Sequence, residues 1–155
     1  MPRALDLEIV TPEGRVFRGE ISSVVLPGCA GELGVLPGHA ATLVQISPGE
    51  LRFEQADQHT TLVVGGGLAE ITGDRMRVLT EMAVDADSVD EAAAAHAIAR
   101  AQEAMKTLSA TDDDEIAAMA AIIQNATAQI HVKRRRRHAG MLNENNLAPV
   151  QPGQI

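Results

Sequence analysis

The first half of the chain consists of short apolar runs separated by turn-forming residues. Leu5, Leu7 and Ile9 alternate with two acidic residues, which is the two-residue period of a strand with one buried face. Further runs follow about every ten residues, with Gly, Pro or Asp between them. These runs cover residues 15–17, 21–26, 42–46, 51–54, 60–64, 68–71 and 76–79. Because no helical stretch separates them, they predict an all-β sandwich or barrel, not a parallel sheet, over residues 1–85.

The second half has a different pattern, rich in alanine and without Gly or Pro before Gly140. Apolar residues recur at spacings of three and four in two blocks, with a polar break at 109–111. The first block contains Ala94, Ile98, Ala101, Met105 and Leu108, and the second contains Ile116, Met119, Ile123, Ala126 and Ile130. Two such seams predict an all-α antiparallel two-helix hairpin over residues 86–138. The remainder, 139–155, is rich in Asn, Gln, Pro and Gly and is predicted to be disordered.

Local signals also suggest how these helices start and how firmly they pack. Ser88 with Glu91, and Asp112 with Glu115, have the spacing of N-terminal capping boxes. Alanine is the best helix former, so each helix should be stable. However, a buried methyl group contributes only about 0.8 kcal/mol, against about 1.5 to 3 kcal/mol for a whole Leu or Ile side chain. We therefore expect sturdy helices whose docking is easily reversed.

Composition argues against most kinds of chemistry. The 155-residue chain has one cysteine, Cys29, so it can form neither an internal disulfide nor a four-thiolate metal site. Its five histidines lack metal-ligand spacing, and no nucleophile-elbow motif occurs. The glycines at 65–67 lack the Lys-Ser or Lys-Thr of a phosphate loop, and a close approach of strands explains them better. We expect no catalytic residue, cofactor site or metal site.

Nucleic acid and membrane partners are also disfavoured. The formal charge is −8, and Phe17 and Phe53 are the only aromatic residues, too few for a base-stacking platform. No stretch approaches the roughly 20 apolar residues that a membrane span needs. We therefore expect any membrane association to run through a partner protein.

A basic run is the sharpest local feature of the sequence. Its members are Lys133, Arg134, Arg135, Arg136 and Arg137, five of the thirteen basic residues, at the predicted end of the second helix. The preceding 132 residues carry 8 basic and 20 acidic side chains. One or two cations would suffice to complement the negative end of a helix, so five suggest an acidic partner. Nucleic acid is the competing partner, but the run lacks interleaved aromatic residues.

Four segments carry a resemblance to a known family. They are Gly-Glu-Leu-Gly-Val-Leu-Pro-Gly-His-Ala at 31–40 and the stretches 47–52, 65–70 and 76–80. Together they closely resemble the epsilon subunit of bacterial F-type ATP synthases, over roughly residues 4–133. The resemblance implies an N-terminal β-sandwich and a C-terminal helical hairpin. It also implies a non-catalytic rotor subunit in the central stalk of a proton-translocating enzyme, peripheral to the bacterial inner membrane on its cytoplasmic side.

The resemblance further implies three sets of contacts. The subunit packs on the gamma subunit and sits on the ring of c subunits, where the loop of Gly31, Glu32, Leu33 and Gly34 faces the polar c-ring loops. His39 lies near the same stalk interface, although the simpler explanation for it is a turn that fixes the sandwich topology. The C-terminal helices inhibit ATP hydrolysis when extended, and the basic run would then meet an acidic segment of the beta subunits.

The sequence lacks the ATP-binding residues that some members of the family carry. Members that bind ATP resemble one another in an Ile/Leu-Asp-x-x-Arg-Ala motif on the first helix and in arginines on the second. Here the matching stretch, 89–94, has Ala93 in place of the arginine, and the corresponding positions on the second helix are Asn125 and Gln129. Because these cations are missing, we expect no tight ATP site near 112–115.

Two other classes of function stay open at this stage. A freestanding module could dock acidic protein or RNA through its basic helix end, and a hidden hydrolase is a weaker third possibility. Co-purification with the gamma subunit and the c ring would separate the first alternative from a rotor subunit. An ATPase assay of the isolated chain would test the second.

Overall fold

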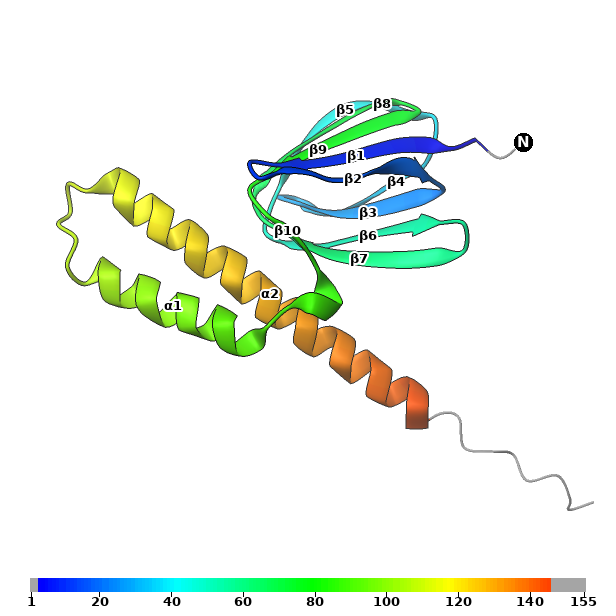
Figure 1. Cartoon of the computed structure of the whole chain (residues 1–155). Coiled ribbons are helices and arrows are strands. Elements are labelled where there is room, and N and C mark those ends of the chain that lie inside the picture. Colours follow the sequence, from blue (N-terminus) through cyan, green and yellow to red (C-terminus); the bar gives the residue numbers. More distant parts are fainter. Residues whose placement is uncertain (1–2, 146–155) are drawn as a thin grey trace, which may run out of the picture.

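The computed structural model describes residues 3–145, which form a β domain followed by two packed helices (Figure 1). The strands are β1 Leu5–Thr11, β2 Gly14–Ile21, β3 Ser23–Gly28, β4 Gly31–Val35, β5 His39–Ile46, β6 Gly49–Gln55, β7 Gln58–Val64, β8 Gly67–Gly73, β9 Arg75–Thr80 and β10 Ala83–Asp85. A 3₁₀ turn, Ala86–Ser88, leads into the helices α1 Glu91–Met105 and α2 Asp113–Asn145. The predicted fold class, a β-sandwich plus a two-helix hairpin, is confirmed.

The strands form one sheet that folds over into two layers. Its order is β10-β7-β6-β3-β5-β8-β9-β1-β2, with β4 added beside β3. The two layers are joined where β3 meets β5, through the single pair Gly28 and Ile46. Neighbouring strands are antiparallel except β1 and β9, which run parallel. In Figure 1 the layer with β5, β8, β9 and β1 lies on the side away from the helices.

The core lies between the layers and follows the predicted alternation. Leu5, Leu7 and Ile9 of β1 are completely buried, and inward side chains of the other strands pack around them. Phe17 on β2, the last strand of the order, and Phe53 on β6, the third, are six places apart in the sheet, yet their ring centroids are 4.4 Å apart. This aromatic pair therefore closes the two layers along one side.

Two strands were not predicted from the sequence. The segment 31–34, expected to be a loop, belongs to β4, which pairs with β3 from Val24 with Val35 to Gly28 with Gly31. Its two glycines disguise it, because glycine is depleted in strands. The short strand β10 is also new, and it extends the sheet edge by pairing with β7. In both cases pairing with a neighbouring strand overrides weak local propensity.

The two helices pack along the predicted seams, whose residues are all buried or partly buried. The predicted start of the first helix was wrong. The N-cap is Asp90, whose carboxylate accepts hydrogen bonds from the backbone N–H groups of Ala92 and Ala93, at 2.9 and 3.1 Å. Ser88 ends the 3₁₀ turn instead, and an extended residue, Val89, separates that turn from α1.

The second helix is longer than predicted. It continues to Asn145, seven residues beyond the expected end at His138, because no proline occurs in this stretch and Gly140 is accommodated within the helix. The rest of the predicted disordered tail, 146–155, lies outside the described residues. Figure 1 shows that α2 extends well past α1 and passes beside the sandwich near β10.

The glycine triplet yields a stability prediction. A Cβ atom on Gly67 would overlap the carbonyl oxygen of Leu79 on β9, whereas one on Gly66 would have its nearest neighbour, the carbonyl oxygen of Ile46, at 3.9 Å. We expect Gly67→Ala to lower the free energy of unfolding by about 3 kcal/mol or more, because the sheet must distort. Gly66→Ala should stay within about 0.5 kcal/mol of the wild type. Urea unfolding followed by circular dichroism would measure both, and equal effects would contradict the close-approach explanation.

Candidate functional site

The contact between α2 and the sandwich is small and aliphatic. Ala128 and Val132 of α2 are buried against Val63 of β7, together with Ala86 and Val89 from the segment that enters the hairpin. Met82 and Val84 pack at the margin of this cluster. This cluster has five buried residues, against sixteen in the sandwich core, so apolar packing here is much weaker than in that core.

Two polar residues of α2 lie beside this cluster. The side-chain amide of Asn125 donates to Glu81 at 3.3 Å, and that of Gln129 lies 3.0 Å from the sulfur of Met82. These are the positions where ATP-binding relatives are expected to carry arginines. In this chain both side chains face the sandwich, while Ala93 is exposed on α1.

The basic run is fully engaged with the chain's own polar groups. The five pairs are Lys133 with the carbonyl oxygen of Asp87, Arg134 with Glu91 at 3.0 Å, Arg135 with Glu50, Arg136 with the Asp87 carboxylate at 3.0 Å, and Arg137 with Glu91 at 3.3 Å. The acidic groups come from three elements, namely β6, the 3₁₀ turn and α1. In this conformation, the acidic partner that the sequence suggested is therefore supplied by the same chain.

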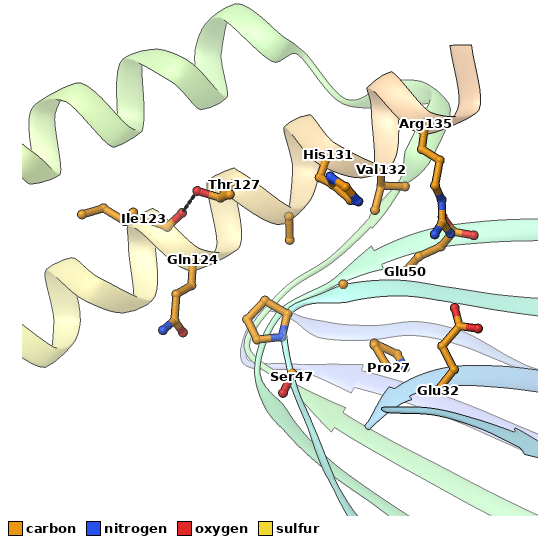
Figure 2. Close-up of a pocket in the computed structure, with 13 residues that line it drawn as sticks. Pro27, Glu32, Ser47, Glu50, Ile123, Gln124, Thr127, His131, Val132 and Arg135 are labelled. Carbon is orange, nitrogen blue, oxygen red and sulfur yellow. Dashed lines mark hydrogen bonds and ion pairs between the residues drawn. The ribbon is translucent and has the colours of Figure 1, made fainter. Parts of the chain in front are cut away.

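A pocket of about 650 Å³ lies between α2 and the edge of the sandwich. Ile123, Thr127 and His131 line its helical side, and Pro27 and Ser47 contribute to its other side (Figure 2). Figure 2 also shows Glu32, Glu50 and Arg135 grouped at one end of this pocket.

A chain of ion pairs crosses that end of the pocket. Arg52 lies 3.4 Å from Glu32 and 2.9 Å from Glu50, and Glu50 also binds Arg135 of α2. The side chain of Glu50 is only 9% exposed, so its two guanidinium partners offset the cost of burying its charge. The hydrogen bond to Glu50 raises the pKa of Arg52 above its ordinary value. Glu32 is thus connected to the second helix through two further side chains.

The structure places the predicted stalk-contact residues at two separate ends of the sandwich. Gly31, at φ +125°, forms the β3–β4 turn, and the Glu32 side chain projects outward with 54% of its surface exposed. Leu33 packs partly against the core and Gly34 is exposed. β4 lies near the Ile46 end of β5.

His39 lies at the other end of β5, opposite Gly73, and its Nδ1 is 2.8 Å from the carbonyl oxygen of Ala40. The seven residue steps from His39 to Ile46 span about 23 Å in an extended strand. The structure therefore does not bring Glu32 and His39 together in one site.

An exposed apolar row on the outer sheet face was missed from the sequence. Leu43, Leu68 and Leu79 are 69%, 45% and 48% exposed. Leu68 and Leu79 are cross-strand partners, and Val10 is paired with Leu79 on the other side. The signal was present, because β8 and β9 carry apolar residues on both faces instead of alternating strictly with polar ones.

Charged residues border this row on the same layer. Glu8 binds Arg15 and Arg77, each at 3.1 Å. Burial raises the pKa of Glu8, but the hydrogen bond from Arg77 and the nearby guanidinium charges outweigh it and hold this pKa below its ordinary value. Glu8, Arg77 and Glu70 are successive cross-strand partners, so a charged ladder runs along one side of Leu68 and Leu79 and ends at Leu43, the partner of Glu70.

The described residues, 3–145, contain no cluster of three or more His, Cys, Asp or Glu side chains that could hold a metal ion. Within the same range, neither α1 nor α2 is long and apolar enough to cross a membrane.

Comparison with known folds defines the class of protein. Residues 4–86 match the family model of the ATP synthase Delta/Epsilon chain β-sandwich domain. A chain in the structure of the OSCP/F1/c-ring part of Euglena gracilis mitochondrial ATP synthase is similar in fold, with a TM-score of 0.65. The two chains share 22% identity, with 83% of this chain and 80% of the Euglena chain covered. The chain thus contains the β-sandwich domain of an ATP synthase delta or epsilon chain.

Sequence relatives identify the family more closely. The ATP synthase epsilon chain of Bordetella avium is 38% identical over 86% of this chain and 94% of its own length. That of Acidithiobacillus ferridurans is 37% identical over 92% of this chain and 99% of its own length. The chain therefore belongs to the ATP synthase epsilon-chain family, whose members are non-catalytic subunits of the central stalk of F-type ATP synthases. The predicted resemblance and the predicted lack of an enzymatic role are confirmed.

The side chains at the hairpin lead to a prediction about nucleotide binding. Because Ala93, Asn125 and Gln129 supply no cation for a phosphate, we expect ATP to bind the isolated chain no more tightly than a dissociation constant of about 1 mM. Isothermal titration calorimetry with ATP and magnesium would measure this. Saturable binding in the micromolar range would show that other residues of the chain supply the phosphate donors.

Proposed function

We propose that this chain is a rotor subunit that links the gamma subunit to the c ring of a proton-translocating ATP synthase and restrains ATP hydrolysis through its C-terminal helices. It would act at the cytoplasmic side of the bacterial inner membrane, held there by its partners. One observation carries the proposal. The compact sandwich leaves two surfaces uncovered, the β4 edge with Glu32 and the outer apolar row, while the helices occupy a third through small apolar contacts and ion pairs.

The β4 edge is suited to the c ring. Glu32 projects from a paired strand, and within residues 3–145 its one charged partner is Arg52, at 3.4 Å. A carboxylate held this way can accept hydrogen bonds from polar loops without rearrangement of the backbone. Gly31 and Gly34 bring no side chains, so the loops can approach the strand closely.

The outer sheet face is suited to the gamma subunit. The exposed apolar row of Leu43, Leu68 and Leu79 lies on the layer away from the helices, so the hairpin does not cover it (Figure 1). Exposed apolar residues clustered beside charged ones are typical of a surface that packs against a protein partner. His39 lies at the far end of β5 from Glu32 and would meet the stalk apart from the c-ring contact.

The hairpin is suited to a brake on ATP hydrolysis. Its contact with the sandwich buries mainly Ala128 and Val132 of α2, so a second set of contacts could shift α2 to an extended position. In that position residues 133–137 would meet an acidic segment of the beta subunits. Family membership over most of the chain disfavours both a freestanding binding module and a hydrolase.

The c-ring contact predicts the effect of a charge reversal. Glu32→Lys should weaken the contact by about 1 kcal/mol or more, since it removes an acceptor and adds a cation beside Arg52. ATP-driven proton pumping in inverted membrane vesicles should fall, while the isolated protein stays folded. The control is Glu103→Lys, the same charge change on an exposed residue of α1. Pumping equal to the wild type in Glu32→Lys would count against this assignment.

The proposed brake predicts the effect of neutralising the basic run. Changing Lys133, Arg134, Arg135, Arg136 and Arg137 to Gln keeps helix propensity and removes the charge. If half of the enzymes are restrained by an extended helix, ATP hydrolysis by the assembled enzyme should rise by about twofold. Arg100→Gln on α1 combined with Lys106→Gln at its C-cap is the control. If the variant hydrolyses ATP at the wild-type rate, and inhibition of the wild-type enzyme does not depend on salt, the basic run is only a solvated helix end.

A further inference from the structure

We infer that residues 133–137 form an electrostatic latch that holds α2 against the rest of the chain, and that Glu50, Asp87 and Glu91 are its receiving groups. The latch stabilises the docked position of α2. Because salt screens ion pairs, the fraction of molecules with α2 docked falls as ionic strength rises. The proposed brake concerns the extended conformation of α2, whereas the latch concerns the docked one. It rests on the proposed function only in its consequence for ATP hydrolysis.

The five cations reach three different parts of the molecule. Arg135 binds Glu50 on β6 and so ties α2 to the sandwich itself. Lys133 and Arg136 bind the backbone and side chain of Asp87, in the 3₁₀ turn. That turn is anchored to the sandwich, because Ala86 is completely buried beside Val63.

The remaining two cations close the hairpin. Arg134 and Arg137 both bind Glu91, in the first turn of α1, at 3.0 and 3.3 Å. If α2 leaves both α1 and the sandwich, it loses all of these partners at once. The basic run therefore opposes extension of α2 whether the helix first separates from α1 or from the sandwich.

The latch matters because little apolar contact holds this part of α2 to the sandwich. On the α2 side, the cluster shared with the sandwich contains only two buried residues, Ala128 and Val132. One exposed ion pair changes a two-state population by about 1.4- to 5-fold, so the four ion pairs acting independently would change it by about 4-fold to several hundred-fold. Such pairs are screened by salt, whereas the aliphatic contacts are not.

Substitutions at Asp87 and Glu91 can test the latch without changing the contacts that the cations make with a partner protein. Neutralising the acids leaves residues 133–137 intact and free to meet a partner. Neutralising the cations instead removes both the latch and the partner contact. The two changes therefore have opposite expected effects on an inhibited enzyme, although both release α2.

The direct test uses the isolated full chain. Spin labels at His59→Cys on β7 and Ala139→Cys on α2, in a Cys29→Ser background, report docking as a distance distribution. In otherwise wild-type protein, this distribution should broaden when NaCl is raised from about 0.05 M to about 0.5 M. Asp87→Asn with Glu91→Gln should raise the undocked population at low salt by about fivefold or more and flatten the salt response.

Two further variants sharpen this test. Glu13→Gln with Glu20→Gln removes two acids that form no ion pair within the described part of the chain, and it should behave like the wild type. Asp87→Arg combined with Arg136→Asp restores an opposite-charge pair and should recover docking relative to Asp87→Arg alone. Distances and salt response equal to the wild type in Asp87→Asn with Glu91→Gln, or no recovery in the charge swap, would overturn the latch.

The assembled enzyme distinguishes the latch from the brake. Asp87→Asn with Glu91→Gln should lower ATP hydrolysis, because more molecules then have a free α2 that still carries its cations. If the distances widen and hydrolysis falls, both the latch and the brake are supported. If the distances widen and hydrolysis does not change, the latch stands and the proposed brake fails.

Discussion

The apolar core between the two sheet layers is the interaction on which every proposed surface depends. Completely buried side chains such as Leu7, Leu26 and Val78 fix the layers face to face, and the pair of Phe17 and Phe53 closes them along one side. Because strand residues alternate between the two faces of a sheet, the residues buried in the core determine which side chains point outward. The exposure of Glu32 and of the outer leucines is therefore a consequence of core packing.

The attachment of the helices is of a different physical kind. The sandwich is held together by large buried side chains, whereas α2 is held against it by small aliphatic side chains and a set of mostly exposed ion pairs. Hydrophobic burial depends little on salt, while exposed ion pairs are screened by it. A single chain can thus combine a body that keeps its shape with a helix whose position responds to its surroundings. This combination is what a rotor subunit with a regulatory element requires.

The ion pairs also connect the two functions. Arg52 lies between Glu32, proposed to face the c ring, and Glu50, which binds Arg135 of α2. The low exposure of Glu50 makes this the least screened link in the set. A surface proposed for assembly and a helix proposed for regulation therefore share one connected group of charges.

The sequence by itself determined the two halves of the fold, the inward residues of β1 and the seams of both helices, because hydrophobic period is a local property. It also carried the family, through segments such as 31–40. It did not determine β4, whose glycines suggest a loop, or the N-cap of α1 at Asp90, because pairing with β3 and the burial of Val89 decide them. Nor could it show that residues 133–137 find their acidic partners in the same chain. Those acids are separated from the basic run by more than 40 residues, and only tertiary packing brings opposite charges that distant in sequence into contact.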